Sequence, residues 1–146
     1  MSERPLDLAA RALRHRDRSR AQLDARLQRA GVDEATRHDA LETLERVGYV
    51  DDARFAAARA AALAGRSFGD AAIRHDLESS GLAADVVEAA LAAVEPEPAR
   101  AEAVVARRGR RAKTGAYLAR KGFDEAVIAD ALGVADAPLP QETLTQ

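Results

Sequence analysis

The sequence predicts an all-α fold built from three tandem three-helix repeats. Alanine, leucine, arginine and glutamate dominate the chain, and all four are good helix formers. No window shows the β-branched alternation that a half-buried strand needs. The 9 glycines and 5 prolines gather at a few places, and one segment around a glycine occurs three times. Because aromatic residues make up only 3% of the chain, small side chains must form the core, and we expect the repeats to form an elongated, curved array.

The repeated segment predicts a helical corner. A leucine lies four residues before a glycine, an apolar residue follows the glycine, and a second leucine lies ten residues after it. The three copies are residues 27–32, 77–82 and 118–123, with Leu41, Leu91 and Leu132 as the second leucines. A glycine just past a helix end adopts the left-handed conformation at low cost, so the chain can turn there. Asp33 and Asp124 are the expected N-caps of the next helices, and Ala83 gives the middle one a weaker start.

A further helix is expected before each corner, over residues 6–15, 51–64 and 99–108. Ser19 and Gln22 form a capping box for the helix that follows the first of these. Asp51 is the expected cap of the second, and the third follows a break at Pro96-Glu97-Pro98. The nine expected helices fall into repeats at residues 1–48, 49–95 and 96–135. Residues 136–146 lack helical periodicity, and we expect them to fray.

Composition excludes several classes of protein. The chain has no cysteine, so it forms neither disulfides nor thiolate metal sites. No apolar run approaches the roughly 20 residues that span a bilayer. The first residues mix acids with bases and lack the apolar core of a signal peptide. We therefore expect a cytoplasmic protein with no membrane contact.

Charge is distributed unevenly along the chain. The net charge of −2 averages two basic segments, within residues 11–29 and 107–121, and an acidic middle, residues 51–97. A polyanionic or acidic partner would meet the two basic segments. The candidate partner-binding or DNA-binding residues are Arg16, Arg18, Arg20, Arg26, Arg29, Arg107, Arg108, Arg110, Arg111, Lys113, Arg120 and Lys121.

Each basic segment also has a simpler interpretation. The first could form ordinary surface salt bridges to Asp17, Asp24 and Glu45. The second could be a solvated connection whose arginines lie favourably near a helix C-terminus. Its seven bases in fifteen residues without one acid favour a binding role.

No catalytic constellation is apparent. His15, His38 and His75 are scattered and predicted to lie on the surface. Asp51 and Asp52 are better explained as helix caps than as metal ligands, and residues 65–69 lack the rest of a phosphate-binding loop. We therefore predict a protein that is not an enzyme and that needs no cofactor or metal.

The few aromatic residues are expected mainly in the core. Tyr49, Phe55 and Phe123 lie at repeat corners and are predicted to be buried. Tyr117 lies beside the second basic segment, where it either packs in the core or stacks on a nucleic-acid base.

Four segments in order resemble the RecX family. Ser-Arg-Ala-Gln-Leu at 19–23 is similar to its S-R-x-E-L opening, and residues 48–56 resemble its G-[YF]-[LI]-[DN]-D-x-x-[FY]-[AV] corner. Residues 69–82 look like its G-x-x-x-I-x-x-x-L-x-x-x-G-I segment, and residues 118–123 like its L-x-[RK]-[RK]-G-F motif. The resemblance covers about residues 8–134.

The resemblance implies a regulator of the RecA recombinase. Members of the family bind RecA filaments on single-stranded DNA and dampen strand exchange, ATP hydrolysis and co-protease activity. For this chain it implies a monomer with RecA as its partner, and direct contact with single- or double-stranded DNA stays open. The alternative is a general nucleic-acid-binding helical module without a RecA partner.

Overall fold

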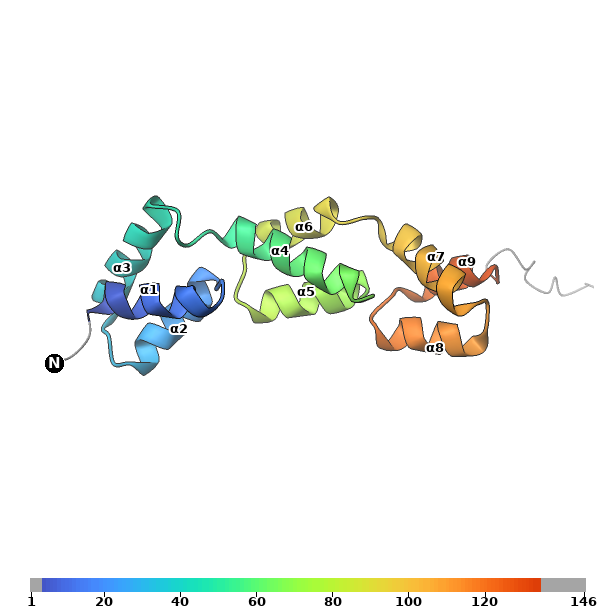
Figure 1. Ribbon diagram of the computed structural model, residues 1–146, viewed down its shortest axis with the longest axis horizontal. Helices are drawn as coiled ribbons and strands as arrows, with labels where there is room; N and C mark the ends of the chain where they lie inside the picture. The colour runs from blue at the N-terminus through green and yellow to red at the C-terminus, as the bar shows by residue number, and fades with distance from the viewer. Residues whose placement is uncertain (1–3, 135–146) are drawn as a thin grey trace, which may run out of the picture. The chain divides into compact units, whose positions relative to one another are not determined.

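The protein is all-helical in the part that its computed structural model describes, residues 4–134 without the side chain of His15. Within these residues there are nine α-helices and no strands. They are α1 Pro5–His15, α2 Arg20–Arg29, α3 Glu34–Arg46, α4 Asp52–Gly65, α5 Asp70–Ser79, α6 Ala84–Ala93, α7 Glu97–Arg108, α8 Ala112–Arg120 and α9 Glu125–Leu132 (Figure 1). The all-α prediction is confirmed. The predicted frayed tail, 136–146, lies outside the described residues.

The predicted caps begin their helices. Ser19 Oγ accepts the backbone N–H of Gln22 at 3.1 Å, and Gln22 Oε1 accepts that of Ser19 at 3.1 Å, which completes the capping box before α2. Asp33 caps α3 by accepting the N–H of Thr36, and Asp124 caps α9 by accepting the N–H of Ala126, each without a reciprocal bond. Asp51 accepts the N–H of Arg54 at 3.0 Å at the start of α4.

The break expected at residues 96–98 lies slightly earlier, at residues 94–96, because α7 already begins at Glu97. Pro96 is its N-cap, and Pro98 lies in its first turn. Proline is tolerated there, since the first N–H groups of a helix have no partner within it. The two prolines thus start the helix.

The corners turn at their glycines as predicted. Gly31, Gly81 and Gly122 have φ of +84°, +78° and +90°. The N–H that follows the first and third returns to the leucine four residues before the glycine: Val32 to Leu27 O and Phe123 to Leu118 O, each at 3.1 Å. This closes the end of the preceding helix.

The helices pack into two compact units. Among the described residues, the N-terminal unit contains residues 4–61 together with Arg74–Ala93, and the C-terminal unit contains Ala62–Ile73 together with residues 94–134. α4 and α5 therefore contribute residues to both. The repeat boundaries at 1–48, 49–95 and 96–135 follow helix order rather than this packing and stay a prediction.

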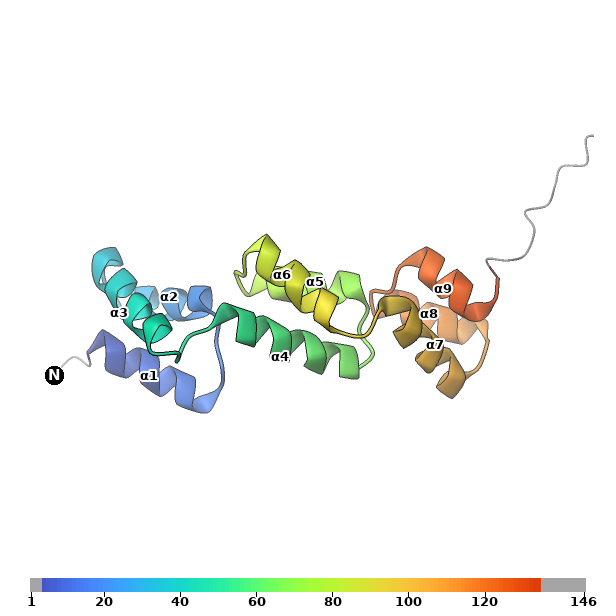
Figure 2. The same ribbon diagram turned by 90° about the horizontal axis from the view of Figure 1, so that it is seen from above.

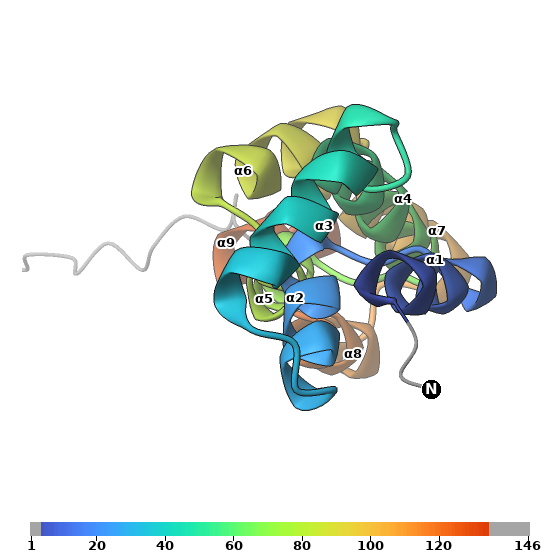
Figure 3. The same cartoon turned by 90° about the vertical axis from the view of Figure 1, so that its left-hand side faces the viewer.

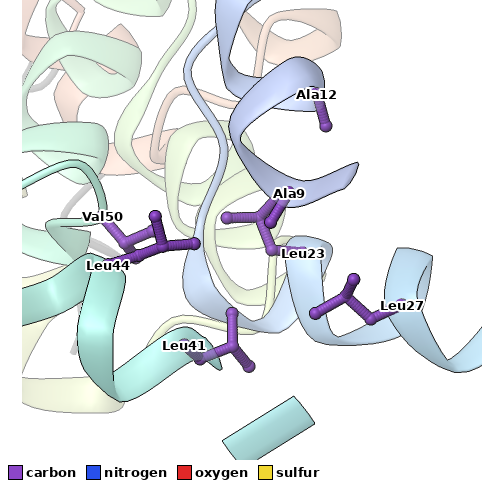
Figure 4. Close-up of a cluster of buried hydrophobic side chains, with 7 residues drawn as sticks. All are labelled: Ala9, Ala12, Leu23, Leu27, Leu41, Leu44 and Val50. Carbon is purple, nitrogen blue, oxygen red and sulfur yellow. The ribbon is translucent and has the colours of Figure 1, made fainter. Parts of the chain in front are cut away.

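The N-terminal unit has a core of small aliphatic side chains. α1, α2 and α3 pack together (Figures 1 and 3). Their buried side chains converge with Val50, as Figure 4 shows: Ala9, Ala12, Leu23, Leu27, Leu41 and Leu44. Leu27 and Leu41 thus share one core across the first corner.

Tyr49 is not in this core, so that prediction is wrong. Its relative exposure is 64%, whereas Val50 is 2% exposed. The turn after Gly48 directs neighbouring residues to opposite sides, and the smaller Val50 fills the core. Phe55 and Phe123 are buried, as predicted.

In the C-terminal unit, α7, α8 and α9 lie side by side (Figures 1 and 2). Their core consists of Ala101, Val104, Val105, Leu118, Phe123 and Ala131. Tyr117 and Leu132 are partly buried against it. Thr114 lies where the other two repeats have Leu23 and Ile73, and its hydroxyl donates to Gly109 O at 2.7 Å.

One joint in the N-terminal unit ties the start of α2 to the following repeat. Ser19 Oγ donates to Ser80 O at 2.6 Å, and the N–H of Arg20 donates to Asp52 Oδ1 at 2.8 Å. A methyl group on Gly81 would lie 2.4 Å from the Cβ of Ala21. The α5 corner and the first carboxylate of α4 therefore meet the same helix end.

The same joint occurs in the C-terminal unit at the start of α5. The N–H of Gly69 donates to Lys121 O at 2.8 Å, and the N–H of Asp70 donates to Glu97 Oε2 at 2.9 Å. A methyl group on Gly122 would lie 2.7 Å from the Cβ of Ala72. The joint holds the turn before α5 against the end of α8, close to several of the predicted site residues.

Candidate functional site

The second basic segment occupies both ends of α8. Arg107 and Arg108 end α7, Arg110 and Arg111 lie in the turn, and Lys113 is in the first turn of α8. The last two bases, Arg120 and Lys121, follow at the other end of α8. All seven are exposed except Lys121, which is half-buried.

Two of these bases lie over aromatic rings. The Cζ of Arg108 is 3.6 Å from the centroid of the Tyr117 ring. The Nζ of Lys121 is 3.9 Å from the centroid of the Phe68 ring and 5.7 Å from that of Tyr117. Arg66 adds a fourth contact, 5.6 Å from the Phe68 ring. We call Arg66, Phe68, Arg108, Tyr117 and Lys121 the cation–aromatic cluster.

Hydrogen bonds hold the turn between α4 and α5 against this cluster. Lys121 Nζ donates to Arg66 O at 3.3 Å, and a guanidinium N–H of Arg107 donates to Ser67 Oγ at 3.2 Å. Ser67 itself has φ of +66°. Together with the bond from Gly69 to Lys121 O, these contacts attach both sides of the turn to the α7–α8 surface.

Sequence reasoning missed Arg66 and Phe68 as members of the surface. They lie about 40 residues before the basic segment, in a turn that has no charge run of its own. Only the joint at the start of α5 brings them beside Lys121. The signal was the repeat itself, since the glycine corners at Gly81 and Gly122 each contact the preceding repeat.

Two buried charged side chains of α7 hold this turn. Glu97 and Arg100 are 7% and 8% exposed. Arg100 donates to Asp70 Oδ1 at 2.9 Å and to Phe68 O at 3.1 Å, while Glu97 accepts the N–H groups of Asp70 and Asp124. These bonds hold the start of α5, and with it the backbone of Phe68, against α7.

Among the residues that the structure describes, the bases of the second segment have no carboxylate partners. Within residues 4–134, none of the seven forms an ion pair with an aspartate or glutamate. Arg111 donates to Arg108 O at 2.7 Å, which satisfies a carbonyl at the end of α7 as the simpler interpretation expected. Its charge is still unopposed, so the surface can attract anions from outside.

The first basic segment lies around the turn between α1 and α2. Arg16 and Arg18 are in the turn, and Arg26 and Arg29 are in the last turn of α2. Arg20, the first residue of α2, forms an ion pair with Glu45. For Arg20 the simpler interpretation therefore describes the structure.

The other acids considered as partners pair elsewhere. Asp24 binds Arg37 at 2.9 Å, and Asp17 lies 3.9 Å from Arg54. Neither arginine belongs to the predicted site. In the described part of the chain, Arg16, Arg18, Arg26 and Arg29 thus have no ion pair with a carboxylate.

Like charges crowd around Arg18. Partial burial and the nearby guanidinium groups of Arg16, Arg26 and Arg29 lower the pKa of Arg18 below its ordinary value. Its Nε donates to Ala12 O at 3.3 Å, which holds the side chain against the end of α1. An anion placed among these four groups would relieve their repulsion.

The histidines and clustered carboxylates are the other candidates for site chemistry. His38 and His75 are exposed, as predicted, and the side chain of His15 lies outside the description. Among the described residues, no group of three or more histidines and carboxylates is arranged to hold a metal ion. No helix within residues 4–134 is long and apolar enough to cross a membrane.

Comparison with known proteins decides the family. A family model described as the second three-helix domain of RecX matches residues 51–91. The regulatory protein RecX of Xanthomonas oryzae pv. oryzae is 32% identical over 130 residues, which cover 82% of this chain and 81% of that protein. The chain belongs to the RecX family.

The RecX relationship extends to other relatives and to the fold. The regulatory protein RecX of Deinococcus radiodurans is 32% identical over 84% of this chain and 64% of its own length. The crystal structure of RecX from Lactobacillus salivarius matches with a TM-score of 0.76 and 18% identity, over 90% of this chain and 94% of that one. The resemblance found in the sequence motifs is confirmed, and so is the RecX fold.

Proposed function

We propose that this RecX-family protein is a non-enzymatic regulator of the RecA recombinase. It binds the RecA filament on single-stranded DNA and inhibits ATP hydrolysis, strand exchange and co-protease activity. Membership of a family whose relatives are named regulatory proteins supports a regulatory role. The sequence resemblance to RecX implies RecA as the protein that is regulated.

The observation that carries the binding part of the proposal is the unopposed charge at α7 and α8. Seven bases that have no carboxylate partner within residues 4–134 lie on the surface of a chain whose net charge is −2. The first basic segment supplies a second contact through Arg16, Arg18, Arg26 and Arg29, and Arg20 contributes if it leaves Glu45. Acidic groups of the filament are the counterpart of both.

The remaining parts of the proposal follow the sequence predictions. The protein acts as a cytoplasmic monomer, needs no cofactor or metal, and makes its contacts through repeats at residues 1–48, 49–95 and 96–135. Direct contact with single- or double-stranded DNA is an additional interaction that the filament complex would permit.

Charge reversal tests the binding surface. Replacing Arg107, Arg108, Arg110 and Arg111 by glutamate should weaken binding to RecA filaments at least about tenfold, because close like charges across an interface cost several kcal/mol. Fluorescence anisotropy with the labelled protein measures the affinity, and circular dichroism verifies the helices.

A single-residue pair gives the matched control. Arg110→Glu should weaken binding, whereas Arg46→Glu should not, although Arg46 is also exposed, at the end of α3. Equal affinities of the two variants and of the quadruple variant would remove α7–α8 from the interface.

The alternative function, a nucleic-acid-binding module without RecA, predicts a different result. Such a protein would bind DNA alone, with an affinity that falls steeply as salt is added. It would leave RecA activities unchanged at salt concentrations that prevent this binding.

A further inference from the structure

We propose that Phe68 and Tyr117 are positioning residues that hold Lys121 and Arg108 in place for an acidic protein surface. The turn at residues 66–68 is then part of the same binding surface as α7 and α8. This inference rests on the proposed function and adds to it the residues that set the geometry of the contact.

The rings support the cations from below. Tyr117 is half-buried against the C-terminal core, so its ring has a fixed position, and the guanidinium of Arg108 lies 3.6 Å from its centroid. Phe68 is also half-buried, and the ammonium of Lys121 lies 3.9 Å from its centroid. A cation over an aromatic face at these distances is attracted by the ring quadrupole.

Fixing these cations beforehand favours binding. A lysine or arginine on a mobile stem loses conformational freedom when it contacts a partner, and this loss reduces affinity. Lys121 has already lost part of that freedom, since Nζ contacts both the Phe68 ring and Arg66 O. Arg108 has lost it through its contact with Tyr117. The two charges are therefore presented at a defined spacing.

The same contacts indicate that the surface recognises charged groups and does not stack on nucleic-acid bases. Stacking of single-stranded nucleic acid requires an open aromatic face. Arg108 covers Tyr117, while Lys121 and Arg66 both lie over Phe68. With base stacking blocked and a chain of negative net charge, carboxylates of a protein fit this surface better than a nucleic-acid strand.

Ring removal and ring retention test the inference. Phe68→Leu and Tyr117→Leu should each weaken binding to RecA filaments on poly(dT) by about threefold to tenfold, because a cation loses its support. Phe68→Tyr and Tyr117→Phe keep a ring and should bind within about twofold of the parent. Tyr49→Leu removes an exposed aromatic ring over which no cation lies among the described residues, and it should have no effect.

A double-variant cycle separates positioning from general destabilisation. If Phe68 acts through Lys121, then Phe68→Leu should cost little further affinity once Lys121→Met has removed the charge. Losses that multiply in the double variant would show that Phe68 acts independently of Lys121 and would overturn the inference. Melting curves for every variant identify any loss of folded protein.

The failures of the two proposals are distinguishable. A parent protein that does not bind filaments contradicts the proposed function. A parent that binds while both leucine variants bind equally well contradicts only the positioning role. Binding of poly(dT) alone with the same dependence on Phe68 and Tyr117 would overturn the assignment of a protein partner in favour of nucleic acid.

Discussion

At Gly122 the chain has room for a hydrogen atom and little more. Its φ is +90°, and a methyl group would lie 2.7 Å from the Cβ of Ala72 and 2.8 Å from its backbone nitrogen. Neither atom is at the end of a flexible side chain, so the backbone itself would have to move. The joint in the C-terminal unit therefore depends on one residue type at this position.

Gly122→Ala should lower the free energy of unfolding by about 1–3 kcal/mol, the usual cost of forcing extra volume into a packed site. Gly65→Ala is the matched control, since its methyl group would meet nothing within 4 Å, and it should be neutral or stabilising by about 0.4–1 kcal/mol. Urea unfolding followed by circular dichroism compares them. Equal midpoints would show that the joint is looser than described.

The Arg59–Asp76 pair predicts a dependence on pH. Both guanidinium nitrogens Nε and NH2 donate to Asp76 at 2.8 Å, and these hydrogen bonds lower the pKa of that carboxyl. A lowered pKa in the folded state gives stability that is complete above the unfolded value and is lost as the pH falls through the folded value.

Asp76→Asn should therefore reduce stability at pH 7 by about 0.2–1 kcal/mol, the range for exposed ion pairs. The difference from the parent protein should persist down to about pH 5 and shrink below about pH 4. Unfolding curves between pH 7 and pH 3 measure it. A difference that stays constant through this range would contradict the role of the ionised pair.

Single residues also show what sequence alone can predict. Ser19, Asp33 and Asp124 are caps that depend only on neighbours within a few positions, and all three were predicted. Tyr49 was predicted to be buried and is exposed, because the direction of the turn after Gly48 decides which of two adjacent apolar residues enters the core. That direction depends on the tertiary position of α4.

At the scale of helices, Glu97 holds together the starts of two of them. Its two carboxylate oxygens accept the N–H of Asp70, at the start of α5, and the N–H of Asp124, the N-cap of α9. Both donors belong to helix ends that have no intrahelical partner for these groups. One buried carboxylate thus joins α5, α7 and α9.

Glu97→Gln should lower the free energy of unfolding by about 1.5–3 kcal/mol. The amide oxygen can accept one of the two N–H groups, but the amide NH2 cannot accept the other, so one charged hydrogen bond is lost. Glu102→Gln, an exposed change in the same helix, should stay within about 0.5 kcal/mol of the parent protein. Thermal and urea unfolding provide the comparison. A neutral Glu97→Gln would mean that water replaces the carboxylate.

Helices themselves were largely predictable, whereas the contacts between them were not. The three ranges predicted in full, 6–15, 51–64 and 99–108, agree with α1, α4 and α7 to within two residues at each end. The start of α7 was misplaced because two prolines around Glu97 resemble a break, although proline is compatible with a first turn. The role of Glu97 depends on the meeting of α5 with α9, which no local pattern encodes.

For the whole molecule, one joint recurs at the starts of α2 and α5. In each unit a helix start receives a backbone carbonyl from beside a corner glycine and a carboxylate from the first residue of a later helix. Ser80 and Asp52 do this in the N-terminal unit, and Lys121 and Glu97 in the C-terminal unit. Gly81 and Gly122 therefore mark the positions at which successive three-helix repeats contact each other.

The candidate surface was predictable only in part. A count of charges finds the bases at 107–121, because seven of them lie within fifteen residues that contain no acid. It cannot find Arg66 and Phe68, which a joint brings to Lys121, nor can it show that Arg20 is bound by Glu45. The positions of charged residues can thus be read from the sequence, whereas the ion pairs that they form depend on the fold.

The most direct test of the central claim is the ATPase rate of RecA on single-stranded DNA with this protein added below one copy per RecA subunit. The proposed regulator should inhibit hydrolysis at this ratio, and the variant with Arg107, Arg108, Arg110 and Arg111 replaced by glutamate should inhibit far less. An unchanged ATPase rate, together with salt-sensitive binding to bare DNA, would contradict the regulation of RecA and favour a nucleic-acid-binding module.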